Sequence, residues 1–165
     1  MADDIRLLFV DDEEEFLRTM KERLELREFE VTTVPNGEEA LAVAETKEFD
    51  VAIVDLRMPG LSGKTVLDEL KRRHKLLEVI ILTGHGTIDS ALECAKLGAH
   101  NYLTKPYDFD DLVSILRDAY EQRLRRKYEH DQWRQEQLTR LAMSGSSLEI
   151  LQRLRELDAE DQENQ

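Results

Sequence analysis

Three carboxylates and one lysine follow short apolar segments of this sequence, and together they could transfer a phosphoryl group. Asp55 ends the apolar run 51–54, Asp11 and Asp12 end an earlier run, and Lys105 ends a later one. Carboxylates about 5 Å apart repel one another by ~3 kcal/mol per pair at an effective dielectric near 20. A divalent cation removes that repulsion, and Mg²⁺ prefers carboxylate, water and phosphate oxygens. We therefore expect Mg²⁺, or Mn²⁺, among these acids.

Asp55 is the candidate nucleophile of this set. An aspartate beside a divalent cation can attack phosphorus and form an aspartyl phosphate. The cation and Lys105 would balance the charge of the transferred group, and Thr83, at the end of a fourth apolar run, adds a hydroxyl. Each residue alone has an ordinary explanation as a helix cap, a turn former or a surface side chain. Their shared position at the ends of strands favours the chemistry.

The elements that must position these residues alternate along the chain. Short apolar runs typical of buried parallel strands are each followed by a helical stripe of apolar residues; the runs are 5–10, 31–34, 51–54, 79–82 and 102–103. Five β-α repeats predict a doubly wound α/β fold with right-handed crossovers. The flavodoxin-like (βα)5 order 2-1-3-4-5 is the leading candidate, since it makes Asp11 and Asp12 neighbours of Asp55 and brings Lys105 within reach.

The chain continues beyond this unit, which we assign to residues 1–122, as a helical extension over 123–165. The helical pattern that starts near Phe109 meets no breaker before about residue 143, so the last helix of the domain should run on as a rod roughly 50 Å long. A turn is expected near 144–146. A second short helix over 147–158 would follow, with a frayed acidic end. That helix is too weak to stand alone in water and needs a partner surface.

Composition excludes several classes of protein. The 165 residues are 41% hydrophobic and 36% charged, and the net charge of −13 argues against binding to nucleic acid or anionic membranes. No apolar stretch approaches the roughly 20 residues needed to span a bilayer. The single cysteine, Cys94, forms no internal disulfide and suits a reducing cytoplasm. We expect a cytoplasmic protein without direct contact to DNA.

The charged residues stand in motifs that resemble those of bacterial two-component receiver domains. The motifs are Val10-Asp11-Asp12, the stretch from Val54 to Gly60, Leu82-Thr83-Gly84, and Leu103-Thr104-Lys105-Pro106. They occur in the family's order and spacing over roughly residues 4–122. The stretch 82–107 looks most like receivers that precede AAA+ transcription activators, although no such ATPase follows in this sequence.

The resemblance implies a role for each matching residue. Asp55 would accept a phosphoryl group, Asp12 would bind Mg²⁺ directly, and Asp11 would bind it mainly through water. The backbone carbonyl of Arg57 would complete the protein's ligands.

The remaining matching residues concern the phosphoryl group and the switch. Lys105 would pair with the phosphoryl group, after a cis Lys105–Pro106 bond, and Thr83 would bond a phosphoryl oxygen. Tyr102 would then swing inward, which is a shift between two packings.

The function implied is a phosphorylation-activated response regulator with no enzymatic activity beyond accepting and losing its own phosphoryl group. Its partners would be a histidine kinase or phosphotransfer protein and a downstream protein target. A homodimer would form either through the face made by the fourth helix, fifth strand and fifth helix, or through the C-terminal helices.

Other interpretations stay open. The chain is either complete, with a docking or dimerisation helix pair, or the N-terminal part of a longer transcriptional regulator. A Mg²⁺-dependent phosphatase with an aspartate nucleophile is disfavoured, because such enzymes usually carry a second acid where Arg57 stands. A flavin carrier of the same topology is disfavoured because the acids at 12–15 would repel phosphate.

Overall fold

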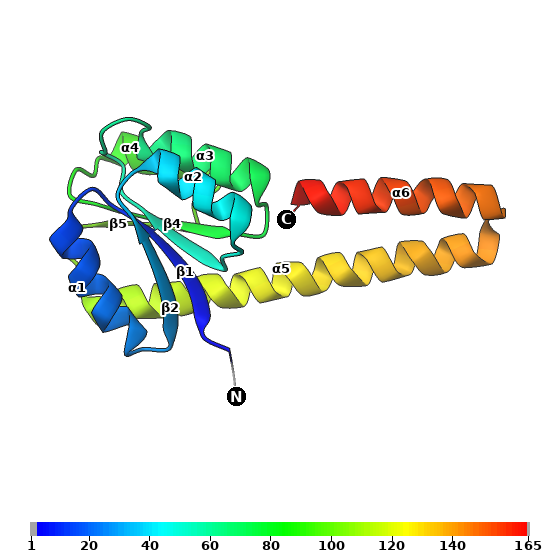
Figure 1. Ribbon diagram of the computed structural model, residues 1–165, viewed down its shortest axis with the longest axis horizontal. Helices are drawn as coiled ribbons and strands as arrows, with labels where there is room; N and C mark the ends of the chain where they lie inside the picture. The colour runs from blue at the N-terminus through cyan, green and yellow to red at the C-terminus, as the bar shows by residue number, and fades with distance from the viewer. Residues whose placement is uncertain (1–2, 165) are drawn as a thin grey trace.

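The computed structural model describes residues 3–164 and shows a five-stranded parallel sheet between two layers of helices, with a helical arm (Figure 1). The strands are β1 (Ile5–Val10), β2 (Phe29–Val34), β3 (Val51–Val54), β4 (Glu78–Thr83) and β5 (Asn101–Thr104). The helices are α1 (Glu14–Glu25), α2 (Gly37–Thr46), α3 (Gly63–Arg73), α4 (Ile88–Lys96), α5 (Phe109–Ser144) and α6 (Ser147–Asn164). The strand order β2-β1-β3-β4-β5 confirms the predicted doubly wound topology.

The continuous apolar strands serve two cores, because successive side chains point to opposite faces of a sheet. Leu8, Val10 and Val54 face one core, under α2, α3 and α4, whereas Leu7, Phe9 and Ile53 face the other, under α1 and α5. The central strands β1, β3 and β4 are thus buried on both sides. They place the residues that follow them at one edge of the sheet.

Helix starts follow the capping chemistry of the sequence. The side chains of Ser62 and Thr87 cap α3 and α4, and Asn36 and Asp108 cap α2 and α5 in the same way. β2 begins at Phe29 rather than at residue 31, because Phe29 pairs with Ile5 and packs in the core. Gly98 ends the α4 segment with a φ of +97°, the conformation in which glycine is favoured.

The predicted rod and turn are present, but the prediction of a short second helix ending at 158 with a frayed tail is wrong. α5 is one uninterrupted helix of 36 residues that passes through residue 122, and α6 continues for 18 residues to Asn164. The acidic end of α6 is held because Asp158 and Asp161 form ion pairs with Arg134, and Asp161 also lies 3.3 Å from His130. Ser146 and Glu149 form a capping box at the start of α6, since each backbone N–H donates to the other's side chain. None of the helices within residues 3–164 meets the length and hydropathy needed to cross a membrane.

Two arginines fix α5 to the sheet at the edge where the strands begin. Arg123 donates to Asp50 at 2.9 Å and to Glu48 at 2.8 Å, while Arg126 donates to Glu78 at 2.8 Å. Asp50 also accepts two hydrogen bonds from the Arg6 guanidinium, at 2.8 and 3.1 Å. This ion-pair network sets the direction in which α5 leaves the domain.

Candidate functional site

The three predicted acids converge at the carboxyl edge of the sheet. One carboxylate oxygen from each of Asp11, Asp12 and Asp55 lies within 4.8 Å of the other two. The register explains this, since Val10 pairs with Val54 and the Asp55 N–H donates to the Val10 carbonyl at 3.0 Å. The residues that follow the paired ends of β1 and β3 are therefore brought side by side.

Lys105 reaches the same place from the loop after β5. Its Nζ donates to Asp11 Oδ2 at 2.8 Å, and Asp11 is fully buried. The ammonium also lies 4.0 Å from the centroid of the Phe16 ring and 3.8 Å from Glu13 Oε1. The Lys105–Pro106 peptide bond is cis. The Lys105 ammonium is thus held by Phe16 of α1 and by Glu13 in the loop before it, as well as by Asp11.

Asp55 is a buried carboxylate with an incomplete set of partners. It is 5% exposed, and its Oδ1 has no hydrogen-bond partner within the described part of the chain. Burial raises the pKa of Asp55, and the nearby charge of Asp11 adds to this rise. Hydrogen bonds from Thr83 and the Arg57 backbone, with the charge of Lys105, oppose the rise in pKa without cancelling it. A buried, unpaired oxygen among three acids fits a bound cation.

Gly63 allows α3 to begin directly against the backbone of the phosphoacceptor candidate. A Cβ at Gly63 would lie 2.2 Å from the Asp55 carbonyl oxygen and 2.5 Å from Leu56 Cα. The Gly63 N–H instead donates to the Leu56 carbonyl at 2.9 Å. Sequence reasoning missed this residue and Phe16. The available signal for Gly63 is a glycine in the first turn of a capped helix, whereas no sequence pattern distinguishes Phe16 from the other apolar residues of α1.

The two predicted switch residues, Thr83 and Tyr102, have different polar partners. Thr83 is fully buried, and its Oγ1 accepts the His85 N–H at 3.2 Å. The Tyr102 hydroxyl instead lies 2.7 Å from Ser90 Oγ, at the start of α4. Tyr102 is therefore bonded to α4 in this conformation, while Thr83 stands beside Asp55.

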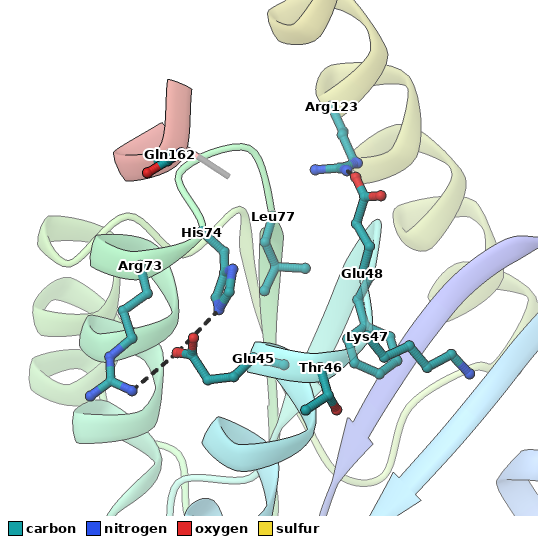
Figure 2. A pocket seen from close by; sticks show the side chains of 11 residues that line it. Glu45, Thr46, Lys47, Glu48, Arg73, His74, Leu77, Arg123 and Gln162 are labelled. Carbon is teal, nitrogen blue, oxygen red and sulfur yellow. Dashed lines mark hydrogen bonds and ion pairs between the residues drawn. The ribbon is translucent and has the colours of Figure 1, made fainter. Parts of the chain in front are cut away.

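A second hollow lies at the opposite edge of the sheet, between α2, α3 and the end of α6 (Figure 2). This cleft of about 330 Å³ is lined by charged side chains that pair with one another: Arg73 bonds Glu45, and Arg123 bonds Glu48. Figure 2 shows Arg73 and His74 both directed at Glu45, with Gln162 of α6 above them. The cleft is the seam where α6 meets the domain, and none of the predicted site residues lies in it.

Comparison with known families agrees with the geometry of the carboxyl edge. The family described as response regulator receiver domain matches residues 7–117, which contain every predicted site residue. The chain belongs to this family. The receiver thus comprises the sheet and its covering helices, and α5 carries it into the helical arm.

Curated relatives share the receiver. The DNA-binding transcriptional regulator NtrC of Salmonella typhimurium is 39% identical over 114 residues, which cover 68% of this chain but 24% of NtrC. The acid tolerance regulatory protein ActR of Rhizobium meliloti is 39% identical over 113 residues, covering 68% of this chain and 58% of ActR. The chain spans about a quarter of the length of its NtrC relatives and somewhat over half of ActR.

Solved receivers show the same fold. A CheY-like response regulator receiver domain protein from Methanospirillum hungatei is 25% identical with a TM-score of 0.72, covering 74% of this chain and 98% of its own. The response regulator TrrA of Thermotoga maritima, solved in complex with Mg²⁺-BeF, is 34% identical with a TM-score of 0.64, covering 70% and 98%. These likenesses reach only the receiver and the start of the arm.

Proposed function

We propose that Asp55 accepts a phosphoryl group from the phosphohistidine of a histidine kinase or phosphotransfer protein. An oxygen of the Asp55 carboxylate forms the new O–P bond while the N–P bond to the imidazole breaks, and the released imidazole takes up a proton. The observation that carries this proposal is the buried Asp55 Oδ1 without a partner, next to Asp11 and Asp12. Lys105, 2.8 Å from Asp11, is within the site to pair with the transferred group.

The acids Asp11, Asp12 and Asp55, with the Arg57 backbone carbonyl, would hold Mg²⁺ or Mn²⁺. When bound, the ion would supply positive charge to balance that of the phosphoryl oxygens. The Mg²⁺-BeF complex of TrrA supports this choice of metal by similarity. Within the chain, Asp11 fixes the position of Lys105, and Thr83 donates to the phosphoacceptor.

Phosphorylation would be read through Thr83 and Tyr102. A phosphoryl group on Asp55 would offer Thr83 a new acceptor and draw its hydroxyl toward the site. Tyr102 would then leave Ser90, to which it is bonded at 2.7 Å, and turn inward. This is a population shift driven by contacts that only the phosphorylated state provides. The surface around α4 and β5 changes, and a downstream protein would recognise it.

The output would be a protein–protein contact, and the chain itself would neither bind DNA nor turn over an external substrate. A second candidate is that these residues form the N-terminal part of a longer transcriptional regulator. The match to NtrC, whose name describes a DNA-binding transcriptional regulator, favours this candidate because the match covers 24% of NtrC.

Intact-protein mass spectrometry after incubation with a small-molecule phosphodonor tests the proposal. The protein should gain one phosphoryl group with Mg²⁺ present and none with a chelator. Asp55→Asn should abolish the gain, whereas Asp50→Asn, at the other end of β3, should keep it. A gain that persists in Asp55→Asn would contradict the assignment of the acceptor.

A further inference from the structure

The arm formed by α5 beyond the sheet and by α6 carries most of the large apolar side chains that are exposed within residues 3–164. α6 lies along the distal half of α5, away from the sheet (Figure 1). Six of the nine large apolar side chains that are exposed within residues 3–164 belong to the arm: Leu124, Tyr128, Trp133, Met143, Leu148 and Leu151. Large exposed apolar groups that cluster on one element mark an interaction site more often than chance.

A row of leucines on α6 shows which side of the arm is open. Leu148, Leu151, Leu154 and Leu157 are spaced by three residues, so the row winds around the helix instead of following one face. The exposed fraction accordingly falls from 67% at Leu148 and 57% at Leu151 to 2% at Leu157, with Leu154 in between. Leu157, at one end of the row, is buried, and Leu148, at the other end near the turn, is exposed on the surface of the arm.

α5 contributes to the same flank. The ion pair of Arg134 with Asp158 sets the antiparallel register, and four residues further along each helix this register places Leu138 beside Leu154. Leu138 is half-buried and Ala142, one turn on, is exposed. Helical geometry thus places Leu138, Ala142, Leu151 and Leu154 on one side of the arm, and Leu148 continues this apolar surface around α6 toward the turn. The five residues are here called the tip flank.

The two helices of the arm differ in charge where they lie side by side. The register places residues 147–162 of α6 beside residues 130–145, at the end of α5. That stretch contains two arginines and two carboxylates, whereas residues 147–162 contain two arginines and five carboxylates. Within one chain, the contrast already yields the pairs of Arg134 with Asp158 and Asp161. Any further helix packed on the tip flank must be apolar at its centre, and beside the acidic α6 it should not itself be acidic.

We propose that the tip flank binds the tip flank of a second copy of this chain. With a two-fold axis parallel to the arm, each α5 lies between its own α6 and the α6 of the partner, so that the two acidic α6 helices are kept apart in a four-helix bundle. The apolar surface meets itself, as a self-complementary interface between identical subunits requires. Both receivers then lie at the same end of the bundle. The association does not depend on the chemistry of Asp55.

Light scattering on the full chain at increasing protein concentration tests the proposal. The wild type should approach twice the chain mass of 19.2 kDa by tens of micromolar. The double variant Leu148→Arg, Leu151→Arg should remain at the single-chain mass, because these leucines are exposed in one chain and are needed only between chains. Leu26→Arg is the matched control, since Leu26 is 86% exposed on the receiver and far from the arm along the chain; it should keep the wild-type mass.

A second variant guards against loss of α6 itself. Far-UV circular dichroism will show whether the double variant keeps its helix content. Ala142→Arg places a charge on the α5 side of the tip flank and should also give single chains. A wild type that stays at 19.2 kDa at every concentration would overturn the proposal. So would a dimer that survives the substitutions on both helices, or a Leu26→Arg variant that dissociates as readily as they do.

Discussion

Two aspartates at opposite ends of β3 have the same burial and opposite electrostatics. Asp50 precedes the strand and Asp55 follows it, and each is 5% exposed. Burial alone would raise the pKa of Asp50, but hydrogen bonds and charge from Arg6, with the charge of Arg123, bring its pKa below the ordinary value. Burial raises the pKa of Asp55, where Thr83, Arg57 and Lys105 do not offset it. The Asp50 carboxylate therefore has a full set of partners, whereas the Asp55 carboxylate does not. The edge of the sheet at Asp50 is here called the closed end, and the edge at Asp55 the open end.

The difference separates structure from function within a single sheet. At the edge where the strands begin, carboxylates meet arginines in closed pairs that hold α5 in place. At the edge where the strands end, three acids share one lysine, and a carboxylate oxygen has no partner among the described residues. The arginine–carboxylate pairs stabilise the fold, whereas the cluster of three acids opposes folding. An arrangement that opposes folding is expected where a ligand binds.

The largest expected change in the free energy of unfolding comes from breaking the ion pairs of Arg123 at the closed end. Arg123→Met removes the hydrogen bonds to Asp50 and Glu48 and leaves a buried carboxylate with Arg6 as its main partner. We expect the free energy of unfolding to fall by about 3 kcal/mol, the lower end of the range for opening a buried ion pair. Urea unfolding measures it. Arg125→Met, which loses an exposed bond to Gln122, should change the free energy by less than about 0.5 kcal/mol.

A smaller change in stability should follow from binding of Mg²⁺ to the acids at the open end. Mg²⁺ at ten times its dissociation constant should stabilise the protein by about 1.4 kcal/mol, because the ion binds only the folded state. Thermal unfolding with Mg²⁺ and with chelator measures the difference. Asp12→Asn should remove the response, and Glu48→Gln should keep it, since Glu48 belongs to the closed end. An equal response in both variants would mean that the ion is not bound at the predicted site.

The smallest effect compares the two aspartates directly. The folded state raises the pKa of Asp55, so the ionised carboxylate opposes folding at neutral pH. Asp55→Asn should therefore stabilise the protein at neutral pH, by less than Mg²⁺ does. The gain should vanish as the pH falls below the ordinary aspartate value of 3.8, where the carboxyl is protonated in the unfolded state as well as in the folded state. Asp50→Asn should do the opposite at neutral pH, because its depressed pKa means that the ionised form stabilises the fold. Equal signs for the two variants in chemical unfolding would refute the comparison.

The open end was predictable from sequence, and the closed end was not. Parallel strands share one carboxyl edge, so apolar runs ending in Asp11, Asp55, Thr83 and Lys105 predict a common site without further information. Asp50 and Arg123 are 73 residues apart, and in a chain that is 36% charged no local pattern selects that pair. The length of α6 was missed for the same reason, because Asp158 and Asp161 are held by Arg134 across the turn. Phe16 and Gly63 act at the site through contacts that only the assembled fold creates.

Paramagnetic broadening by Mn²⁺ in amide NMR spectra tests most directly whether the carboxyl edge alone binds a metal. Substoichiometric Mn²⁺ should broaden the amide signals of residues 10–13, 54–57 and 83–85, and leave those of residues 48–50 and 76–79 sharp. Excess Mg²⁺ should restore the broadened signals by competition. Broadening centred on the closed end, or equal broadening at both ends, would contradict the account.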